Sequence, residues 1–277
     1  MDGALGPHLL HLCELRESEG VTFDETPNLK IVTCSIMESM SAIGESEMQK
    51  AKSQISETFP SREGLTRAES RTLLGAALAV LILYAVGVIA LGTPPSASDT
   101  GEQVVTWFRQ HREDARWAVW AATVSIPPFA VMFALLRRLL PSPHRDVFLI
   151  GAIAFVITYA VQAWTWGGLA LHADRLEAAT ASTVLDVALF WGPVLTGATI
   201  TMIAPVTLLA LRGQELPRWL GVLGAIAFAE QAVETITIFG TAGFTEPGGA
   251  MNLLLGAGLT ATWMLAFAVW GGLRTCR

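Results

Sequence analysis

The sequence has few charged residues and few cysteines. Charged side chains make up 15% of its 277 residues and hydrophobic ones 52%, and the mean hydropathy is +0.48. Ordinary soluble domains carry about 25% charged residues. The composition therefore excludes that class and indicates a protein embedded in a lipid bilayer. The three cysteines (Cys13, Cys34 and Cys276) stand too far apart for a Cys-x-x-Cys motif or a disulfide framework.

Motifs for nucleic-acid binding, metal binding and catalysis are also missing. The formal net charge is −6 and no basic stripe is present, so no nucleic acid is expected as a partner. None of the five histidines lies in a long apolar segment, which argues against a haem-binding bundle, and no cofactor is expected. The cluster of His172, Asp174 and Glu177 lacks the spacing of a known metal site, and no Gly-x-Ser-x-Gly motif occurs. An enzymatic role is therefore disfavoured.

The first 70 residues differ in composition from the rest. They hold all three lysines and four of the eight methionines, whereas all nine tryptophans come after residue 100. They contain no apolar run that resembles a secretory signal, and too little apolar surface for a packed core. We therefore predict a poorly ordered cytoplasmic tail over residues 1–70. Translation from Met37 or Met48 is the alternative explanation for the change in composition.

Residues 71–277 alternate between long apolar segments and short polar loops. A helix that crosses a membrane needs about 20 consecutive apolar residues. The pattern predicts an all-α bundle of six transmembrane helices, at Thr72–Gly92, Trp117–Leu136, Val147–Leu171, Val184–Leu211, Trp219–Phe239 and Gly249–Leu273. In the loop after the first segment, Val104, Val105 and Phe108 have helical spacing and predict a short amphipathic helix on the outer membrane surface.

The arginines predict the orientation of the bundle. Ten arginines after residue 60 lie on the side of the two chain ends: before the first apolar segment, after the last one, and in the second and fourth loops. The loops on the opposite side hold four arginines. The positive-inside rule then places both termini in the cytoplasm. The layout over residues 65–277, rich in Ala, Leu, Trp and Arg, resembles the uncharacterised six-span integral membrane proteins of actinobacteria. That resemblance implies a plasma-membrane location.

The segment Trp219–Phe239 contains two carboxylates. With a rise of about 1.5 Å per residue, Glu230 lies roughly 16 Å from Trp219, near the middle of a hydrocarbon core about 30 Å thick. Glu234 follows one turn later on the same helix face. The apolar residues contribute about −3 to −5 kcal/mol to insertion, whereas two central acids cost roughly +5 to +7 kcal/mol. The segment is therefore expected inside the bundle, with partners for its carboxyl groups or with a carboxyl group protonated.

Two polar residues of the third segment are predicted at the same depth as these glutamates. Counted from the inner end of that segment, the heights of Tyr159 and Gln162 match those of Glu230 and Glu234 within a few ångströms. They are the best candidate partners for the carboxyl groups. A protonated glutamate that is hydrogen-bonded to Tyr159 or Gln162 would serve helix packing alone. An ionised glutamate could instead bind a proton or a cation.

Prolines and small polar residues lie near the same depth in two other segments. In the second segment Ser125 precedes Pro127 and Pro128, and the loss of two backbone donors predicts a broken helix. In the fourth segment Thr196 lies between Gly-Pro and Pro205. Broken helices beside buried acids are typical of a midplane binding site. Proline and threonine are also ordinary packing residues in membranes.

Two functions from different classes fit this pattern. The first is a small carrier or permease in which Glu230 and Glu234 bind a proton or a cationic small molecule. The second is a non-transporting scaffold or regulatory protein whose polar residues only fix helix packing. The lipid bilayer is the expected environment for both, and a second copy of the chain or another membrane protein is a candidate partner. The two halves of the bundle show no clear internal repeat, so the inverted-repeat signature of many carriers is missing.

Overall fold

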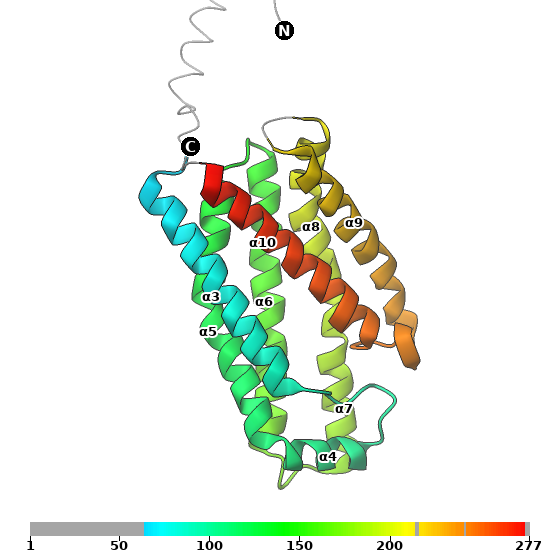
Figure 1. The fold of residues 1–277 in the computed structure, drawn as a ribbon. Helices are drawn as coiled ribbons and strands as arrows, with labels where there is room; N and C mark the ends of the chain where they lie inside the picture. The colour runs from blue at the N-terminus through cyan, green and yellow to red at the C-terminus, as the bar shows by residue number, and fades with distance from the viewer. Residues whose placement is uncertain (1–63, 214–215, 241, 275–277) are drawn as a thin grey trace, which may run out of the picture. The chain divides into compact units, whose positions relative to one another are not determined.

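In the computed structural model, residues 64–213, 216–240 and 242–274 are described, and every regular element among them is helical. Six helical segments are long and apolar enough to cross a membrane (Figure 1). They are Arg67–Leu91, Arg112–Arg137, His144–Leu171, Ala178–Leu211, Arg218–Phe239 and Met251–Arg274. The predicted all-α, six-span bundle is confirmed. Residues 1–63 of the predicted tail lie outside the part of the chain that the structure describes.

Several helices begin a turn before the apolar run that predicted them. Helix α3 (Arg67–Leu91) has a capping box, in which the Thr66 hydroxyl accepts from the Glu69 amide and the Glu69 carboxylate accepts from the Thr66 amide. Helix α5 (Arg112–Arg137) carries Glu113 and Asp114 in its first turn. Caps and acids at a helix start satisfy or complement its free backbone N–H groups. Polar residues therefore extend the helices beyond the hydrophobic boundary.

The predicted break at Pro127 and Pro128 is wrong. Both prolines lie inside α5, which continues without interruption to Arg137. Helix α5 packs against α3 on one side and against α6 (His144–Leu171) on the other. These contacts hold the helix in place although two backbone donors are missing, as is common in membrane bundles. Ser125 is buried in the turn before the prolines, where its hydroxyl donates to the Ala122 carbonyl at 2.7 Å.

Irregular turns occur instead in the last three spans. The fourth span consists of α7 (Ala178–Leu189) and α8 (Trp191–Leu211), separated at one residue. In the fifth span, α9 (Arg218–Glu234) tightens into the 3-10 helix η1 (Thr235–Phe239). The sixth span begins as a π-helix, η3 (Met251–Gly256), and continues as α10 (Ala257–Arg274). A short 3-10 turn, η2 (Gly243–Thr245), lies between the last two spans.

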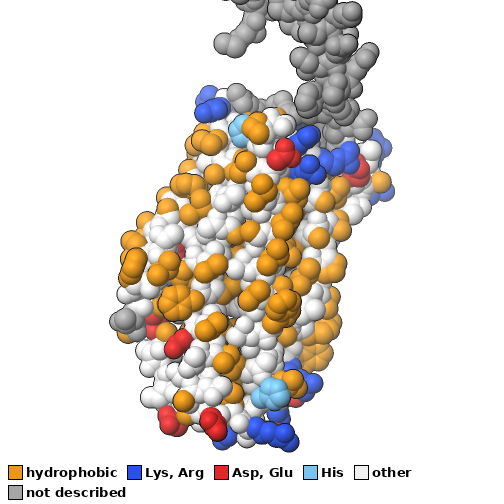
Figure 2. Space-filling model, turned by 180° about the vertical axis from the view of Figure 1, so that it is seen from behind, with side chains coloured by type: hydrophobic (Ala, Val, Ile, Leu, Met, Phe, Trp, Pro, Cys, Tyr) orange, Lys and Arg blue, Asp and Glu red, His pale blue; other side chains and the backbone are white. Residues whose placement is uncertain are grey.

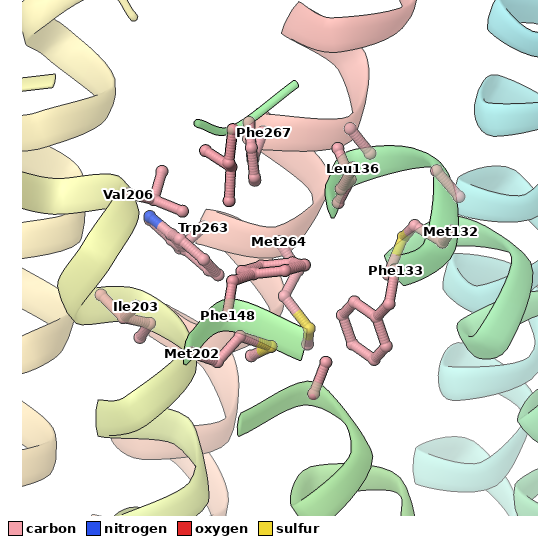
Figure 3. Packing of buried hydrophobic residues seen from close by; sticks show 14 of the residues in the cluster. Met132, Phe133, Leu136, Phe148, Met202, Ile203, Val206, Trp263, Met264 and Phe267 are labelled. Carbon is pink, nitrogen blue, oxygen red and sulfur yellow. The ribbon is translucent and has the colours of Figure 1, made fainter. Parts of the chain in front are cut away.

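Large apolar side chains fill the centre of the bundle. Figure 3 shows this packing, with labelled residues from α5, α6, α8 and α10: Met132, Phe133, Leu136, Phe148, Met202, Ile203, Val206, Trp263, Met264 and Phe267. A glycine brings α6 close to α8, because an added Cβ at Gly151 would lie 2.5 Å from the backbone nitrogen of Met202. Small residues permit such close approach of helices in membranes.

The surface of the bundle is apolar along its length and charged at its ends. Ile89, Phe239 and Leu254 are among the many large apolar side chains that are mostly exposed. Figure 2 shows apolar side chains over the middle of one face and basic side chains near its two ends. Such a surface matches a hydrocarbon layer between two polar interfaces. The six spans and this surface thus indicate an integral membrane protein in contact with lipid.

Helix α4 (Gly101–Gln110) is the predicted amphipathic helix, and it starts from the cap residue Thr100. Its apolar residues Val104, Val105 and Phe108 are buried in a second cluster with side chains from α6 and α7, such as Trp166 and Leu185. The apolar face of α4 is therefore covered by protein. It is not available for the membrane surface, where the sequence had placed it.

Candidate functional site

Glu234, at the end of α9, lies inside the bundle with both carboxyl oxygens hydrogen-bonded. Its side chain is 3% exposed. The Gln231 amide Nε2 donates to Glu234 Oε2 at 2.5 Å, and the Asn252 amide Nδ2 donates to Glu234 Oε1. Gln231 and Asn252 are also buried. Two amide donors and one carboxylate therefore form a closed polar cluster between the fifth and sixth spans.

The orientation of both amides follows from their other partners. Asn252 Oδ1 accepts from the backbone N–H of Gly248 at 3.0 Å, so its Nδ2 must face Glu234. The Gln231 Nε2 donates to Glu230 Oε2 at 2.9 Å as well as to Glu234. Only the N–H₂ side of an amide can donate to two carboxylates. Both contacts present a donor to Glu234, and donors favour the charged form of a carboxyl group.

Glycines leave the room that this cluster occupies. An added Cβ at Gly256 would meet Glu234 Oε2 and would lie 2.9 Å from Gln231 Nε2. An added Cβ at Gly192, in α8, would lie 2.9 Å from Asn252 Nδ2. Real Cβ atoms do not approach other heavy atoms so closely. The π-helix η3 places both Asn252 and Gly256 beside the carboxylate, and π-turns are frequent at functional sites.

Glu230 has a different environment from Glu234. It is only partly buried, whereas the buried face of α9 contains Ala227, Gln231 and Glu234 at helical spacing. One carboxyl oxygen of Glu230 accepts from Gln231, and the other, Oε1, is buried without a hydrogen-bond partner among the described residues. The two acids predicted on one interior face are therefore unequal, and Glu234 is the interior one.

An inner cavity of about 80 Å³ adjoins Glu234. Polar members of its wall are Tyr84, Ser125, Tyr159, Thr199, Gln231, Glu234, Asn252 and Thr260. A water molecule requires at least about 10–15 Å³ of such volume, so the cavity can hold several waters or a small cation. Glu234 is the only charged residue in its wall among residues 64–213, 216–240 and 242–274.

The structure brings some of the other predicted residues to this cavity. Ser125 and Tyr159 line it together with Glu234. Thr196 is buried near the Glu234 carboxyl group, and its hydroxyl donates to the Gly192 carbonyl at 3.0 Å. Gln162 does not line the inner cavity. Neither Tyr159 nor Gln162 is the hydrogen-bond partner predicted for the glutamates; Gln231 and Asn252 are.

A second, outer cavity of about 640 Å³ lies next to the first, in the half of the bundle toward α4. Its wall includes Gln162, and it shares Tyr84, Tyr159 and Trp191 with the inner cavity. Sequence reasoning missed this cavity, and it also missed Asn252. Asn252 could have been recognised because it is an amide side chain within an apolar span. Burying an amide there is unfavourable unless it has a hydrogen-bond partner.

Comparison of the chain with protein-family models, with curated proteins and with solved structures finds no match. The chemistry of the two cavities is therefore the basis for a functional assignment.

Proposed function

We propose that the protein is a small carrier of the plasma membrane that binds a proton or a small cation at Glu234, with both termini in the cytoplasm. The observation that carries this proposal is a buried carboxylate in the wall of a cavity that no basic side chain of the described residues lines. An ionisable group inside a membrane protein is costly, and such groups usually belong to ion or proton pathways. The cavity gives the carboxylate space for a cation or water that a packing role does not need.

The hydrogen bonds around Glu234 support reversible binding. Gln231 and Asn252 both donate to it, so the ionised carboxylate keeps two partners after a proton or cation leaves. The orphaned hydroxyl of Thr260, in the same cavity wall, offers a further polar contact for water or a cation. A buried carboxylate without donors would instead stay protonated.

The alternative is a purely structural cluster in a non-transporting scaffold. Its supporting observation is that the same hydrogen bonds join α9 to η3 and so hold two spans together. On this alternative the wild type conducts nothing. Glu234→Leu would then strand the amides of Gln231 and Asn252 and destabilise the protein by about 1–3 kcal/mol, whereas Glu234→Gln, which keeps one of the two acceptor oxygens, would destabilise it less.

Proton flux into vesicles separates the two functions. The full-length protein is reconstituted in liposomes with a pH-sensitive dye inside, and a potassium diffusion potential drives cations inward. On the carrier proposal, vesicles with the wild type acidify or take up small cations, and Glu234→Gln abolishes the flux. Because Gln keeps only one of the two acceptor oxygens, the variant should unfold at a lower temperature than the wild type and still be folded at the assay temperature. Asp186→Asn is the matched control, because Asp186 is an exposed acid in a span and lines neither cavity. Equal flux in wild type and Glu234→Gln would refute the proposal.

A further inference from the structure

We propose that the outer cavity is a binding site for a hydrophobic organic cation, such as an amphipathic amine or a quaternary ammonium compound, with Glu246 as its counter-charge. This inference names the substrate class of the proposed carrier and in that respect rests on the proposed function. Binding can nevertheless be measured without transport.

The dimensions of the two cavities assign them to different ligands. Sites for small organic molecules have volumes of about 300–1,000 Å³, and the outer cavity, at about 640 Å³, lies in that range. The inner cavity, at about 80 Å³, is too small for such a molecule. An organic substrate would therefore bind in the outer cavity, whereas a proton or small cation would bind at Glu234.

Glu246 is a buried carboxylate with an unpaired oxygen in the wall of the outer cavity. Its side chain is 7% exposed, and its Oε2 atom has no hydrogen-bond partner among the described residues. A backbone hydrogen bond closes the turn that carries it, because the Gly249 N–H donates to the Glu246 carbonyl at 2.9 Å. Leaving a carboxylate buried and unpaired is costly. A bound cation would remove that cost.

Glycines fix Glu246 at this position. Gly248 has a φ of +73°, a conformation that side chains other than glycine rarely adopt. An added Cβ at Gly249 would lie 2.9 Å from the Glu246 Cγ atom. The backbone therefore turns tightly against the glutamate side chain and holds it in the cavity wall.

The remaining wall of the outer cavity suits a hydrophobic cation. Among the described residues that line it, Glu246 is the only charged one, so the net charge of this wall is negative. Four aromatic residues contribute to the wall, from α3, α6 and α8: Tyr84, Tyr159, Trp166 and Trp191. Aromatic faces attract cations, most strongly at desolvated sites. Aliphatic side chains such as Leu83, Val119 and Leu253 provide the apolar remainder.

Asn252 connects the two sites. Its Oδ1 accepts from Gly248, two residues after Glu246, and its Nδ2 donates to Glu234. The two cavities also share Tyr84, Tyr159 and Trp191. An organic cation that shifts the turn at Glu246 would thereby move a hydrogen-bond donor of Glu234. This arrangement provides the physical contact that coupling of the two ligands would need.

Binding of tetraphenylphosphonium to the purified full-length protein tests the inference. Tetraphenylborate is the probe control, because it has nearly the same shape and the opposite charge. We expect saturable binding of the cation by the wild type and a loss of at least about tenfold in affinity for Glu246→Gln, which removes the charge and keeps the shape. Glu177→Gln is the matched control, since Glu177 is an exposed acid outside both cavities, and its affinity should remain within about twofold of wild type.

A second variant covers the case in which Glu246→Gln does not fold. Ala118→Trp narrows the outer cavity from α5 without touching a charge, and it should also weaken cation binding. The inference is overturned if the wild type does not bind the cation saturably, if it binds tetraphenylborate equally well, or if the folded variants bind like the wild type. Binding of the organic cation without proton flux would refute the carrier proposal and leave the binding site in place. Glu234-dependent flux without binding of the organic cation would refute the binding site and leave the carrier proposal in place.

Discussion

Adding one methyl group beside Glu234 tests the geometry of the candidate site directly. Gly256→Ala introduces a Cβ that would meet Glu234 Oε2 and would lie 2.9 Å from the Gln231 amide nitrogen. Gly258→Ala is the matched control two residues further along the same span, because an added Cβ there meets no atom within 4 Å. The two substitutions share their chemistry and differ in what the new methyl group contacts.

The expected effects have opposite signs. Alanine is favoured over glycine inside a helix by about 0.5–1 kcal/mol, so Gly258→Ala should be neutral or slightly stabilising. Gly256→Ala must displace the Glu234 carboxylate from the amides of Gln231 and Asn252. Hydrogen bonds to charged groups contribute about 1.5–3 kcal/mol each. After the alanine preference is subtracted, Gly256→Ala should lower the free energy of unfolding by about 2–5 kcal/mol.

Titration of the purified protein with sodium dodecyl sulfate, followed by tryptophan fluorescence, measures these changes. A double-mutant cycle makes the assignment specific. In a Glu234→Ala background the carboxylate no longer occupies the space beside Gly256 and the Gln231 amide can move aside. Gly256→Ala should then behave like Gly258→Ala, with a coupling energy of about 3–6 kcal/mol between positions 234 and 256. Equal stability of the two single alanine variants would refute the placement of the carboxylate.

Three further predictions concern the bundle. In a background without native cysteines, Ser98→Cys should react with an impermeant maleimide from outside intact cells and Ser142→Cys should not; the reverse pattern would invert the predicted orientation. Gly151→Ala should lower the midpoint of thermal unfolding because its methyl group meets the α8 backbone, whereas Gly75→Ala, which meets nothing within 4 Å, should leave the midpoint unchanged or higher. Thr66→Ala should cost about 1 kcal/mol in the detergent titration because α3 loses its N-terminal cap, and an unchanged unfolding curve would contradict that role.

The sequence was a good guide to the spans and a poor guide to side-chain partners. The six apolar segments are separated by polar loops, and length and hydropathy locate them without knowledge of the neighbours. Depth along each helix follows from the rise per residue, which predicts Tyr159 at the level of Glu234, and both residues line the inner cavity. The direction in which a side chain points also depends on how each helix is rotated, and that rotation is set by packing. Gln162 therefore lies at the outer cavity and Asn252 takes the predicted role.

The other failures have local causes. Pro127 and Pro128 suggested a break in α5, but flanking helices hold that span continuous. The sequence does not predict Glu246 as a site residue, because it lies in a predicted loop, where an acid is ordinarily solvated. Its burial results from the tight turn at Gly248 and Gly249 and from the neighbouring spans, neither of which hydropathy describes.

The irregular turns around Glu234 favour a binding site over a packing cluster. Two spans can pack with regular helices and small residues at their contact. Here the fifth span tightens into a 3-10 turn directly after Glu234, and the sixth begins with a π-helix that carries Asn252 and Gly256. Both kinds of turn have poorer hydrogen-bond geometry than an α-helix. A 3-10 stretch within a helix often marks a functional hinge, and π-turns occur frequently at functional sites. Regular helices could make a packing contact between the fifth and sixth spans, and the regular helix α9 already supplies Gln231 as one donor. The π-turn of the sixth span adds the Asn252 amide as a second donor to the carboxylate beside the inner cavity.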